Sequence, residues 1–590
     1  MGQAKRAKNG TSKSYGINWK AIMQWLSFVY LTYITAGYCL ICPEGYVEYD
    51  VYKSKMFWIP SLIFALCEIA LWAFSVDSSE HFRFGYKEGK HKIDFVMYAL
   101  LAVWGISTLV SANSSTAFLG DEYRHQGFLF FGLALIAMFL ISHIGGWNKV
   151  STGILMTVLA IVYVWQMLNY FGIVPFDWQM NRQYPFLVAC LANVDQNAAF
   201  DGIAIAATTA AFVLCKNKLK KALWGVLNVL CIMGAISTRS DSFYLGLAIG
   251  AVIIVGYSLR HKEYIRSTAI AMALYLVGIF LIRLLESRFG DRAIYSIHLE
   301  NTGAALITSD GMVKILAALV VAFLIVAFIY SMLPDKITKV IHLIYVILVA
   351  GGGICAVIYF TGLYFSDSQS DVAIFLRDAL ASRAPIWKYS IVNMGYQDIT
   401  HQLFGVGFGN FNRIMDRYSS VVYTIRDYAE LADAHNILID LFVATGALGV
   451  LSWLALLICA VVKFRRSAGH YPWAMIGVML VAGVIATGLA NTSLIIVTPW
   501  VYVGIGIMLY QADFNERTVS VILTESENAG ETVDDAKKSE ADKTDADKAE
   551  PVTSENTSDD RVTSDIDKME WAEVKNPKGG KGKKKRKGKN

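Results

Sequence analysis

Charged residues are scarce in this chain of 590 residues. Asp, Glu, Lys and Arg together make up 17% of it, whereas hydrophobic residues make up 55%. Soluble globular proteins contain about 25% charged residues, so the composition excludes an ordinary soluble domain and indicates a membrane protein. The net charge of +5 adds little, because positive and negative residues are concentrated in different parts of the chain.

Cysteines and clustered metal ligands are also few. The eight cysteines are scattered, and most lie inside apolar stretches, where cysteine behaves as a small hydrophobic residue. Cys39 and Cys42 form the only close pair, and a zinc site there would need further ligands nearby. Acidic pairs such as Asp121 and Glu122 are too sparse for a hard-cation site. We therefore expect no metal and no cofactor.

Long apolar runs, by contrast, recur from Ala21 to Gln511. Each is long enough to cross a bilayer. The first is too long for the core of a signal peptide and has no clear small-residue cleavage site, so we expect it to be retained. The prediction is an all-α polytopic membrane protein with about fourteen transmembrane helices, at residues 21–42, 56–76, 93–112, 126–145, 152–171, 196–215, 222–238, 242–258, 265–283, 313–332, 339–362, 436–461, 472–490 and 493–511.

The distribution of Lys and Arg predicts the orientation of these helices. The N-terminal segment 1–20 is basic, and alternate loops carry further Lys and Arg clusters, which favours the cytoplasmic side for all of them. Both chain termini are then cytoplasmic, and the membrane domain covers 21–511. A large external loop at 363–435, between the eleventh and twelfth helices, is the only one large enough to fold over a site.

The composition changes abruptly after the last apolar run. Residues 512–590 are rich in Glu, Asp, Lys, Thr and Ser with almost no aromatic residues, which is typical of a disordered tail. The basic cluster at 578–589 either contacts anionic lipid headgroups on the cytoplasmic leaflet or remains solvated. We expect the membrane as a partner and no nucleic acid.

Three arginines stand in the predicted outer segments. Arg239 lies between two apolar runs, where a guanidinium is costly unless it snorkels, pairs with Asp241 or binds an anion. Arg383 lies near the start of a predicted interfacial helix, either as an anchor or as a ligand for a diphosphate, which suits its planar fork. Arg124 is either a further anion contact or the partner of a neighbouring acid.

A histidine and a glycine-rich turn complete the candidate site. His435, between Asp433 and Asn436, is predicted to head the twelfth helix. The positive end of a helix disfavours the imidazolium, so this ring is either a neutral base near pH 7 or simply a cap or interface residue. Gly405 and Gly407 lack the preceding strand and following lysine of a nucleotide loop. We interpret them as a tight turn that lets the backbone approach a neighbour.

In combination these motifs resemble the O-antigen ligase and polymerase superfamily of bacterial membrane proteins. The matching stretches are 120–127, 237–240 at a helix junction, Ser382–Trp387, Phe404–Gly409, and Ala434–Asp440 followed by Thr445–Gly449. One departure is that about four helices, rather than two, separate the second stretch from the large outer loop.

The resemblance implies an inverting, metal-independent glycosyltransferase of the bacterial plasma membrane. Such a protein moves a glycan from undecaprenyl diphosphate to a hydroxyl of a glycan, lipid or cell-wall acceptor at the outer face. The resemblance further implies that Arg239 and Arg383, assisted by Arg124, hold the diphosphate and that His435 activates the acceptor. The supporting residues would be Asn436, Asp433, Gly405 and Gly407. Ligase and polymerase share this machinery.

Two other classes of function fit a polytopic protein. A transporter, such as a polysaccharide flippase, should show paired halves with interrupted helices and a polar site at the membrane midplane. No internal repeat relates 20–250 to 260–511. A membrane scaffold or sensor that acts through the tail would leave the outer arginines and the histidine dispensable.

Overall fold

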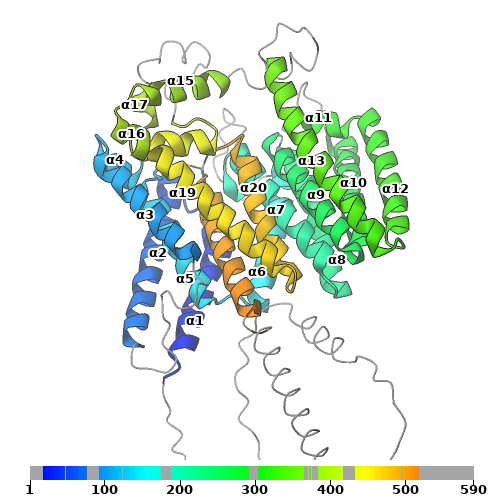
Figure 1. Cartoon of the computed structure of the whole chain (residues 1–590), viewed down its shortest axis with the longest axis horizontal. Coiled ribbons are helices and arrows are strands. Elements are labelled where there is room, and N and C mark those ends of the chain that lie inside the picture. Colours follow the sequence, from blue (N-terminus) through cyan, green and yellow to red (C-terminus); the bar gives the residue numbers. More distant parts are fainter. Residues whose placement is uncertain are drawn as a thin grey trace, which may run out of the picture.

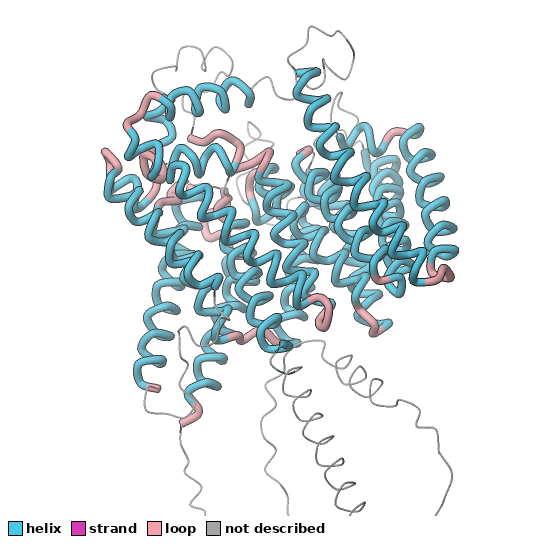
Figure 2. Tube along the Cα trace, viewed as in Figure 1, coloured by secondary structure: helices cyan, strands magenta, loops and turns pink. Residues whose placement is uncertain are grey.

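The computed structural model describes residues 17–46, 48–75, 92–122, 124–173, 188–238, 240–290, 303–364, 370, 374, 383–415, 432–492, 494–516 and 518. Within these ranges the regular structure is helical, with no strand, and the long helices stand side by side (Figures 1 and 2). Ten of the described helices are long and apolar enough to cross a membrane. The all-α class is confirmed, and the helices are consistent with a polytopic membrane protein.

The helices follow one another as α1 (Trp19–Thr32), η1 (Tyr33–Tyr38), α2 (Tyr49–Phe74), α3 (Lys92–Val110), α4 (Ser114–Leu119), α5 (Phe128–Ile144), α6 (Lys149–Tyr170), η2 (Ala189–Leu191), α7 (Val194–Leu214), α8 (Lys218–Thr238), α9 (Ser242–Arg260), η3 (Lys262–Tyr264), α10 (Ile265–Phe289), α11 (Gly303–Thr308), α12 (Asp310–Tyr330), α13 (Asp335–Tyr364), α15 (Arg383–Gly395), α16 (Ile399–Phe404), α17 (Phe411–Met415), α19 (Ile437–Ser467), η6 (Pro472–Ala474) and α20 (Met475–Gly488). A last helix covers 497–516.

Each predicted transmembrane range overlaps one of these helices. Two of the matching helices, at Phe128–Ile144 and Pro472–Gly488, are shorter apolar helices, so the count of fourteen stays a prediction.

Helix α2 begins at Tyr49, seven residues before the predicted start at 56. The predicted transmembrane range covers the apolar run, which begins at Met56 after Lys53 and Lys55. In the structure Lys53 is fully buried, and its ammonium donates hydrogen bonds to the carbonyl oxygens of Tyr38 (2.6 Å), Cys39 (3.3 Å) and Ile41 (2.8 Å). These carbonyls end the first helix, so the lysine satisfies groups that no amide reaches.

The centre and the edge of the bundle differ sharply in burial. Helix α7 lies at the centre and packs against α8, α9 and α20. Of its most apolar 18-residue stretch, 89% is buried. Small residues allow this: a Cβ on Gly246 of α9 would lie 2.6 Å from the carbonyl oxygen of Gly202 on α7. Such close contact is typical of helix pairs in membranes. Helices α12 and α13 lie at the edge, and 6% and 0% of their most apolar 18-residue stretches are buried.

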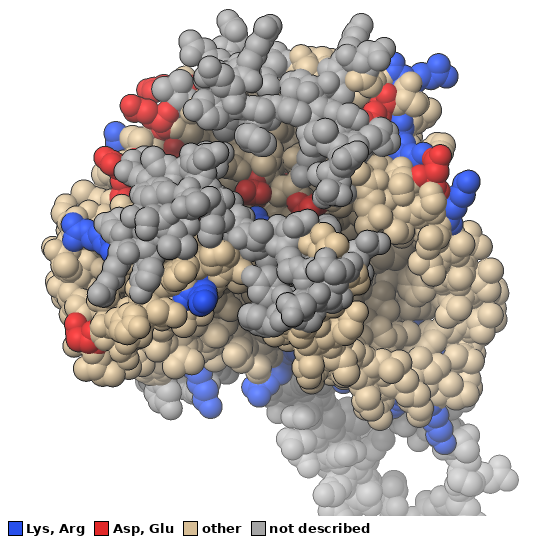
Figure 3. Space-filling model, turned by 90° about the horizontal axis from the view of Figure 1, so that it is seen from above, with Lys and Arg blue, Asp and Glu red and all other residues tan. Residues whose placement is uncertain are grey.

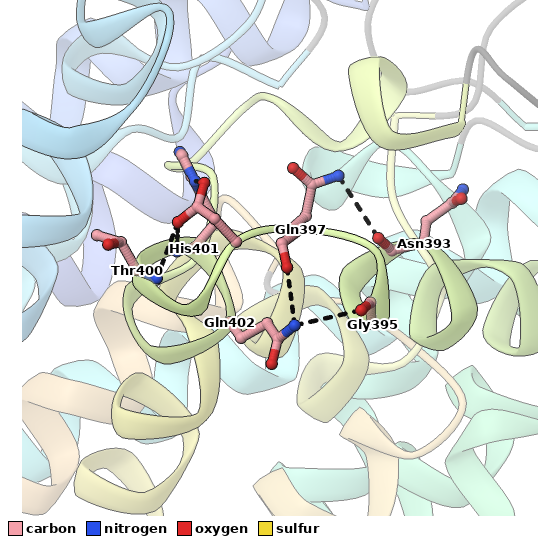
Figure 4. Close-up of polar contacts among 7 residues, drawn as sticks. Asn393, Gly395, Gln397, Thr400, His401 and Gln402 are labelled. Carbon is pink, nitrogen blue, oxygen red and sulfur yellow. Dashed lines mark hydrogen bonds and ion pairs between the residues drawn. The ribbon is translucent and has the colours of Figure 1, made fainter.

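The described part of the predicted external loop consists of the short helices α15, α16 and α17, which lie over one end of the bundle (Figure 1). The turn between α15 and α16 is closed by side-chain hydrogen bonds (Figure 4). The Gln402 amide donates to the carbonyl oxygens of Gln397 (2.8 Å) and Gly395 (3.2 Å). Asp398 caps α16 by accepting from the Thr400 amide (2.8 Å). The rest of 363–435 lies largely outside the described residues.

Candidate functional site

His435 lies at the junction between the outer segment and the bundle, immediately before α19. Its backbone is left-handed, with φ of 50°, a conformation that few non-glycine residues adopt. Asn436, the next residue, caps α19 by accepting from the amides of Leu438 (3.1 Å) and Ile439 (3.3 Å). Its own amide donates to the carbonyl oxygen of Leu489 (3.1 Å), which follows α20. Asn436 therefore caps the helix, and the His435 ring does not.

Asp433 holds the His435 ring from one side and an arginine from the other. One carboxylate oxygen lies 3.0 Å from His435 Nδ1 and accepts from the His435 backbone amide at 2.9 Å. The other accepts from Arg124 at 2.5 Å. In a neutral imidazole this geometry places the hydrogen on Nδ1 and the lone pair on Nε2. The arrangement is the one that a general base requires.

Burial and charge act on Asp433 in opposite directions. Burial raises the pKa of this carboxyl, but Arg124 and His435 outweigh it and bring the pKa well below its ordinary value. Asp433 in turn raises the pKa of Arg124 above its ordinary value. Asp433 is 8% exposed and Arg124 27%, so this ion pair is shielded from solvent and stays ionised across the physiological pH range.

The sequence offered a neighbouring acid as the alternative partner of Arg124, and the structure shows a different one. Asp121 accepts from the Arg124 backbone amide at 2.6 Å, whereas the guanidinium reaches Asp433, 309 residues further along the chain. No local sequence pattern predicts such a long-range pair. The predicted role of Arg124 as a diphosphate contact stays a prediction.

Helix α15 ties Arg383 to the same junction. Trp387 donates its indole N–H to the carbonyl oxygen of Ala434 at 2.8 Å, so this tryptophan does more than anchor a helix at an interface. Arg383 lies one helical turn earlier, on the same face of α15. Its Nε atom is buried and has no hydrogen-bond partner. A guanidinium nitrogen in that state has the capacity to bind an anion.

Arg383 also acts on the junction between α8 and α9. Burial raises the pKa of Asp241 at this junction, while the amide of Gly303, which donates to Asp241 at 2.8 Å, and the charge of Arg383 partly offset that rise. Arg383 therefore lies near Asp241 despite the additional helices between the two segments in the sequence. Arg239, two residues from Asp241, lies outside the described residues.

The glycine-rich turn is bonded to the backbone of α19. Val406 and Gly407 donate their amides to the carbonyl oxygens of Val443 and Ala444, both at 2.9 Å. These carbonyls stand just before Gly446, where a φ of 66° and ψ of −171° interrupt the helix. The turn therefore satisfies acceptors that the interruption leaves without helical partners.

Glycine is required at two positions of this turn. Gly405 has a φ of 78°, and a Cβ there would lie 2.3 Å from backbone atoms of Ala444. Gly407 has a φ of 92°, and its Cβ would lie 2.7 Å from the side chains of Ser111 and Ala117. The geometry is that of a tight turn in close contact with neighbouring backbone.

Beside this turn lies a cavity of about 70 Å³. It is lined by Asp121, Arg124, Gln126, Phe131, Gly407, Phe408, Gly409, Phe411, Ala432, Asp433, Asp440, Leu441, Val443, Ala444 and Thr492. Seen from the end that carries α15 to α17, the molecule is hollowed, with acidic side chains at the bottom of the hollow (Figure 3). Asp440 ends the stretch Ala434–Asp440, and the sequence predicted no role for this residue itself. Its carboxylate accepts from the Ala434 amide at 2.6 Å.

No protein-family model matches the chain, and no curated protein matches it either. The resemblance to O-antigen ligases and polymerases therefore rests on the motifs alone. In the described part of the chain, no group of three or more His, Cys, Asp or Glu side chains could hold a metal ion, and Cys39 and Cys42 are buried free thiols.

Proposed function

We propose that the protein is a membrane glycosyltransferase of the O-antigen ligase and polymerase type. It would transfer or polymerise a glycan from undecaprenyl diphosphate onto an acceptor hydroxyl at the outer face of a bacterial plasma membrane. In this proposal the chain crosses the membrane fourteen times with both termini in the cytoplasm, and 363–435 is the external loop. The end of the bundle with α15 to α17 is then the outer face.

The observation that carries the proposal is the hydrogen-bonded Asp433–His435 pair beside a cavity. Asp433 orients the imidazole through Nδ1 at 3.0 Å and stabilises the imidazolium that forms when Nε2 takes a proton. Positioned general bases of this kind contribute about 10²- to 10⁴-fold to a rate. A histidine that served only as a helix cap would not need a second, ionised partner, and Asn436 already caps the helix.

The proposed reaction assigns each of these residues a role. The acceptor hydroxyl attacks the anomeric carbon of the donor sugar while His435 Nε2 removes the hydroxyl proton. The new carbon–oxygen bond forms on the face opposite the breaking one, so the sugar carbon inverts. The bonding electrons of the broken bond leave with the diphosphate, whose added negative charge Arg383 and Arg239 would stabilise. The buried Nε atom of Arg383, which has no hydrogen-bond partner, supports this role.

The experiment measures release of undecaprenyl diphosphate from a lipid-linked glycan by the purified protein, with and without a chelator. We expect the wild type to be active in both conditions, and His435→Ala, Arg383→Ala and Arg239→Ala to lose at least about 10²-fold in rate. Folding of each variant is checked by thermal unfolding in detergent.

The chain offers matched controls in the same outer segment. His401 on α16 also pairs with an aspartate, Asp398, at 2.5 Å, and Arg413 on α17 is exposed. His401→Ala and Arg413→Ala should retain wild-type activity. Equal activity of the site variants and these controls would contradict the proposal. Movement of the lipid-linked glycan across the bilayer without cleavage would instead identify a transporter.

A further inference from the structure

A second cavity lies inside the helix bundle and has a volume of about 140 Å³. Helix α7 forms one wall, and α6, α20 and the last helix contribute to the others. Its lining residues run from Phe200 to Ala211 on α7 and from Val497 to Met508 on the last helix. Each stretch rises by about 16 Å along its helix, so the cavity is long and narrow. This shape suits a chain laid along the helices better than a compact ligand.

Small side chains create this space. Between 196 and 214, Ala204 and Ala207 are half-buried, whereas the other residues of α7 are buried. Both alanines line the cavity, and Gly504 lines it from the last helix. Protein interiors are otherwise close-packed, so an empty space of this size at the centre of the bundle would be costly. An occupant that fills it would restore the missing contacts.

The wall of the cavity is apolar. The hydroxyl of Thr152 donates to the carbonyl oxygen of Asn148 at 3.2 Å, and that of Thr208 donates to the carbonyl oxygen of Ile205 at 3.4 Å. These hydroxyls are therefore satisfied by neighbouring carbonyl groups, and the surface left for a ligand is mainly hydrocarbon and aromatic. An apolar protein cavity of about 150 Å³ stays dry and binds a hydrocarbon. The wall thus selects an apolar occupant.

Positive charge lies at one end of the cavity. Trp224 lines the cavity near the start of α8, and Lys221 lies one turn before it on the same face. The Lys221 ammonium donates to the hydroxyl of Ser267 at 2.6 Å and lies 5.3 Å from the centre of the Phe212 ring. Both of these partners are neutral. Lys218, in the first turn of the same helix, is exposed. Lysines near a membrane surface attract anionic lipid headgroups.

We infer that the cavity holds one acyl chain of an anionic phospholipid, whose headgroup lies against Lys218 and Lys221. The tail of a lipid diphosphate is the other hydrocarbon chain to consider, but its headgroup would lie beside Arg383, near the junction at the far end of α8. The phospholipid belongs to the leaflet at the end opposite α15 to α17, which is the cytoplasmic leaflet in the proposed orientation. The inference goes beyond the proposed function and requires no transfer reaction.

The test is photolabelling of the full-length protein in lipid nanodiscs with phosphatidylglycerol and phosphatidylcholine probes. Both probes have the same acyl chains, with a diazirine at the end of one chain, and labelled peptides are mapped by mass spectrometry. We expect the phosphatidylglycerol probe to label 200–211 of α7. Because the rest of α7 is buried in the bundle, lipid that merely surrounds the protein does not reach this segment. The phosphatidylcholine probe should label it at least about fivefold less.

Variants separate the chain site from the headgroup site. Ala207→Leu fills the cavity and should lower the labelling of α7 at least about threefold, whereas Ala350→Leu, the same change on the exposed surface of α13, should not. Gly504→Ala narrows the cavity from the facing wall and should act in the same direction if Ala207→Leu does not fold.

The double change of Lys218→Gln and Lys221→Gln should abolish the preference for phosphatidylglycerol. Lys336→Gln, which removes an exposed charge from the start of α13, should retain that preference. Melting temperatures show which variants are folded.

Each other outcome overturns the inference. Labelling confined to exposed helices such as α12 and α13, equal labelling of α7 by the two probes, or labelling unchanged in the cavity variants would exclude a bound anionic phospholipid. Loss of the label in excess undecaprenyl phosphate would assign the cavity to the tail of the donor instead. Because labelling is measured apart from transfer, a labelled cavity in a protein without transferase activity would sustain the lipid site and contradict the proposed function. Transferase activity without labelling of α7 would do the reverse.

Discussion

The indole N–H of Trp387 and the carbonyl oxygen of Ala434 lie 2.8 Å apart. This hydrogen bond joins α15, which begins with Arg383, to the residue that precedes His435. It connects the helix of the proposed anion-binding residue to the segment of the proposed base. Arg383 and His435 are thus linked through this bond, although they lie 52 positions apart in the sequence.

We first predict that Trp387→Phe uncouples these groups without unfolding the protein. The substitution keeps an aromatic ring and removes the donor, which leaves the Ala434 carbonyl short of a partner. We expect the free energy of unfolding to fall by about 1 kcal/mol. The activation free energy of transfer should rise by more than that, because a misplaced base slows the reaction strongly. Trp25→Phe, at a tryptophan 65% exposed on α1, is the control. A normal rate for Trp387→Phe would show that this bond does not position His435.

Our second prediction concerns the ion pair of Asp433 and Arg124. The pKa of Asp433 is lowered in the folded protein, so its contribution to stability is present above the unfolded pKa of about 3.9 and is lost as the pH falls through the lower, folded value. Asp433→Asn should therefore destabilise the protein by about 1.5–3 kcal/mol at both pH 5 and pH 7. The difference from wild type should shrink below about pH 4.

A double-mutant cycle with Arg124→Met isolates the pair. Unfolding by denaturant at pH 7 should give a coupling energy above about 1 kcal/mol for Asp433 and Arg124. The corresponding cycle for Arg283 and Asp310, a pair with Asp310 80% exposed, should give a value near zero. Similar coupling energies for the two pairs would show that the Asp433–Arg124 pair is not shielded from solvent.

The third prediction tests the glycine turn. Gly407→Ala should destabilise the protein by more than about 1 kcal/mol, because the new Cβ clashes with Ser111 and Ala117 and the positive φ disfavours alanine. Gly395→Ala is the matched change in the same outer segment, where a Cβ has nothing within 4 Å. It should be neutral or slightly stabilising. Melting temperatures of the two variants decide the matter, and equal values would argue against the close contact.

The fourth prediction isolates the anion site from catalysis. Inorganic diphosphate should raise the melting temperature of the wild type, because a ligand that binds only the folded protein stabilises it. Arg383→Ala should abolish this shift, and the exposed Arg413→Ala should leave it unchanged. A shift that survives in Arg383→Ala would place diphosphate elsewhere. A parallel series with added salt in place of diphosphate shows how much of the change in melting temperature comes from general screening of charges.

How much of this was readable from the sequence depends on the distance over which each feature is determined. The helical class follows from apolar runs, and the tight turn at Gly405 is a local pattern. The cap is local too, but the sequence considered His435 for it and the structure shows Asn436. The turns of α2 before residue 56 were not predicted, because Lys53 is satisfied there by carbonyl oxygens of Tyr38, Cys39 and Ile41. The Arg124–Asp433 pair was missed for the same reason: its two halves meet only in the folded chain. Asp440 was within a motif, but the cavity that it lines is formed by four separate segments of the chain.

The interruption of α19 at Gly446 has a mechanical consequence. The carbonyl oxygens of Val443 and Ala444 accept from Val406 and Gly407 rather than from the part of α19 that follows Gly446, so the first turns of the helix are joined directly to the outer segment. Gly446 marks the point where the hydrogen-bond ladder of α19 is interrupted. Above the interruption, Asn436 is bonded to Leu489 after α20; below it, Phe464 lies against Gly477 of α20. Both parts of α19 are therefore fixed to α20, and the upper part is also bonded to the glycine turn.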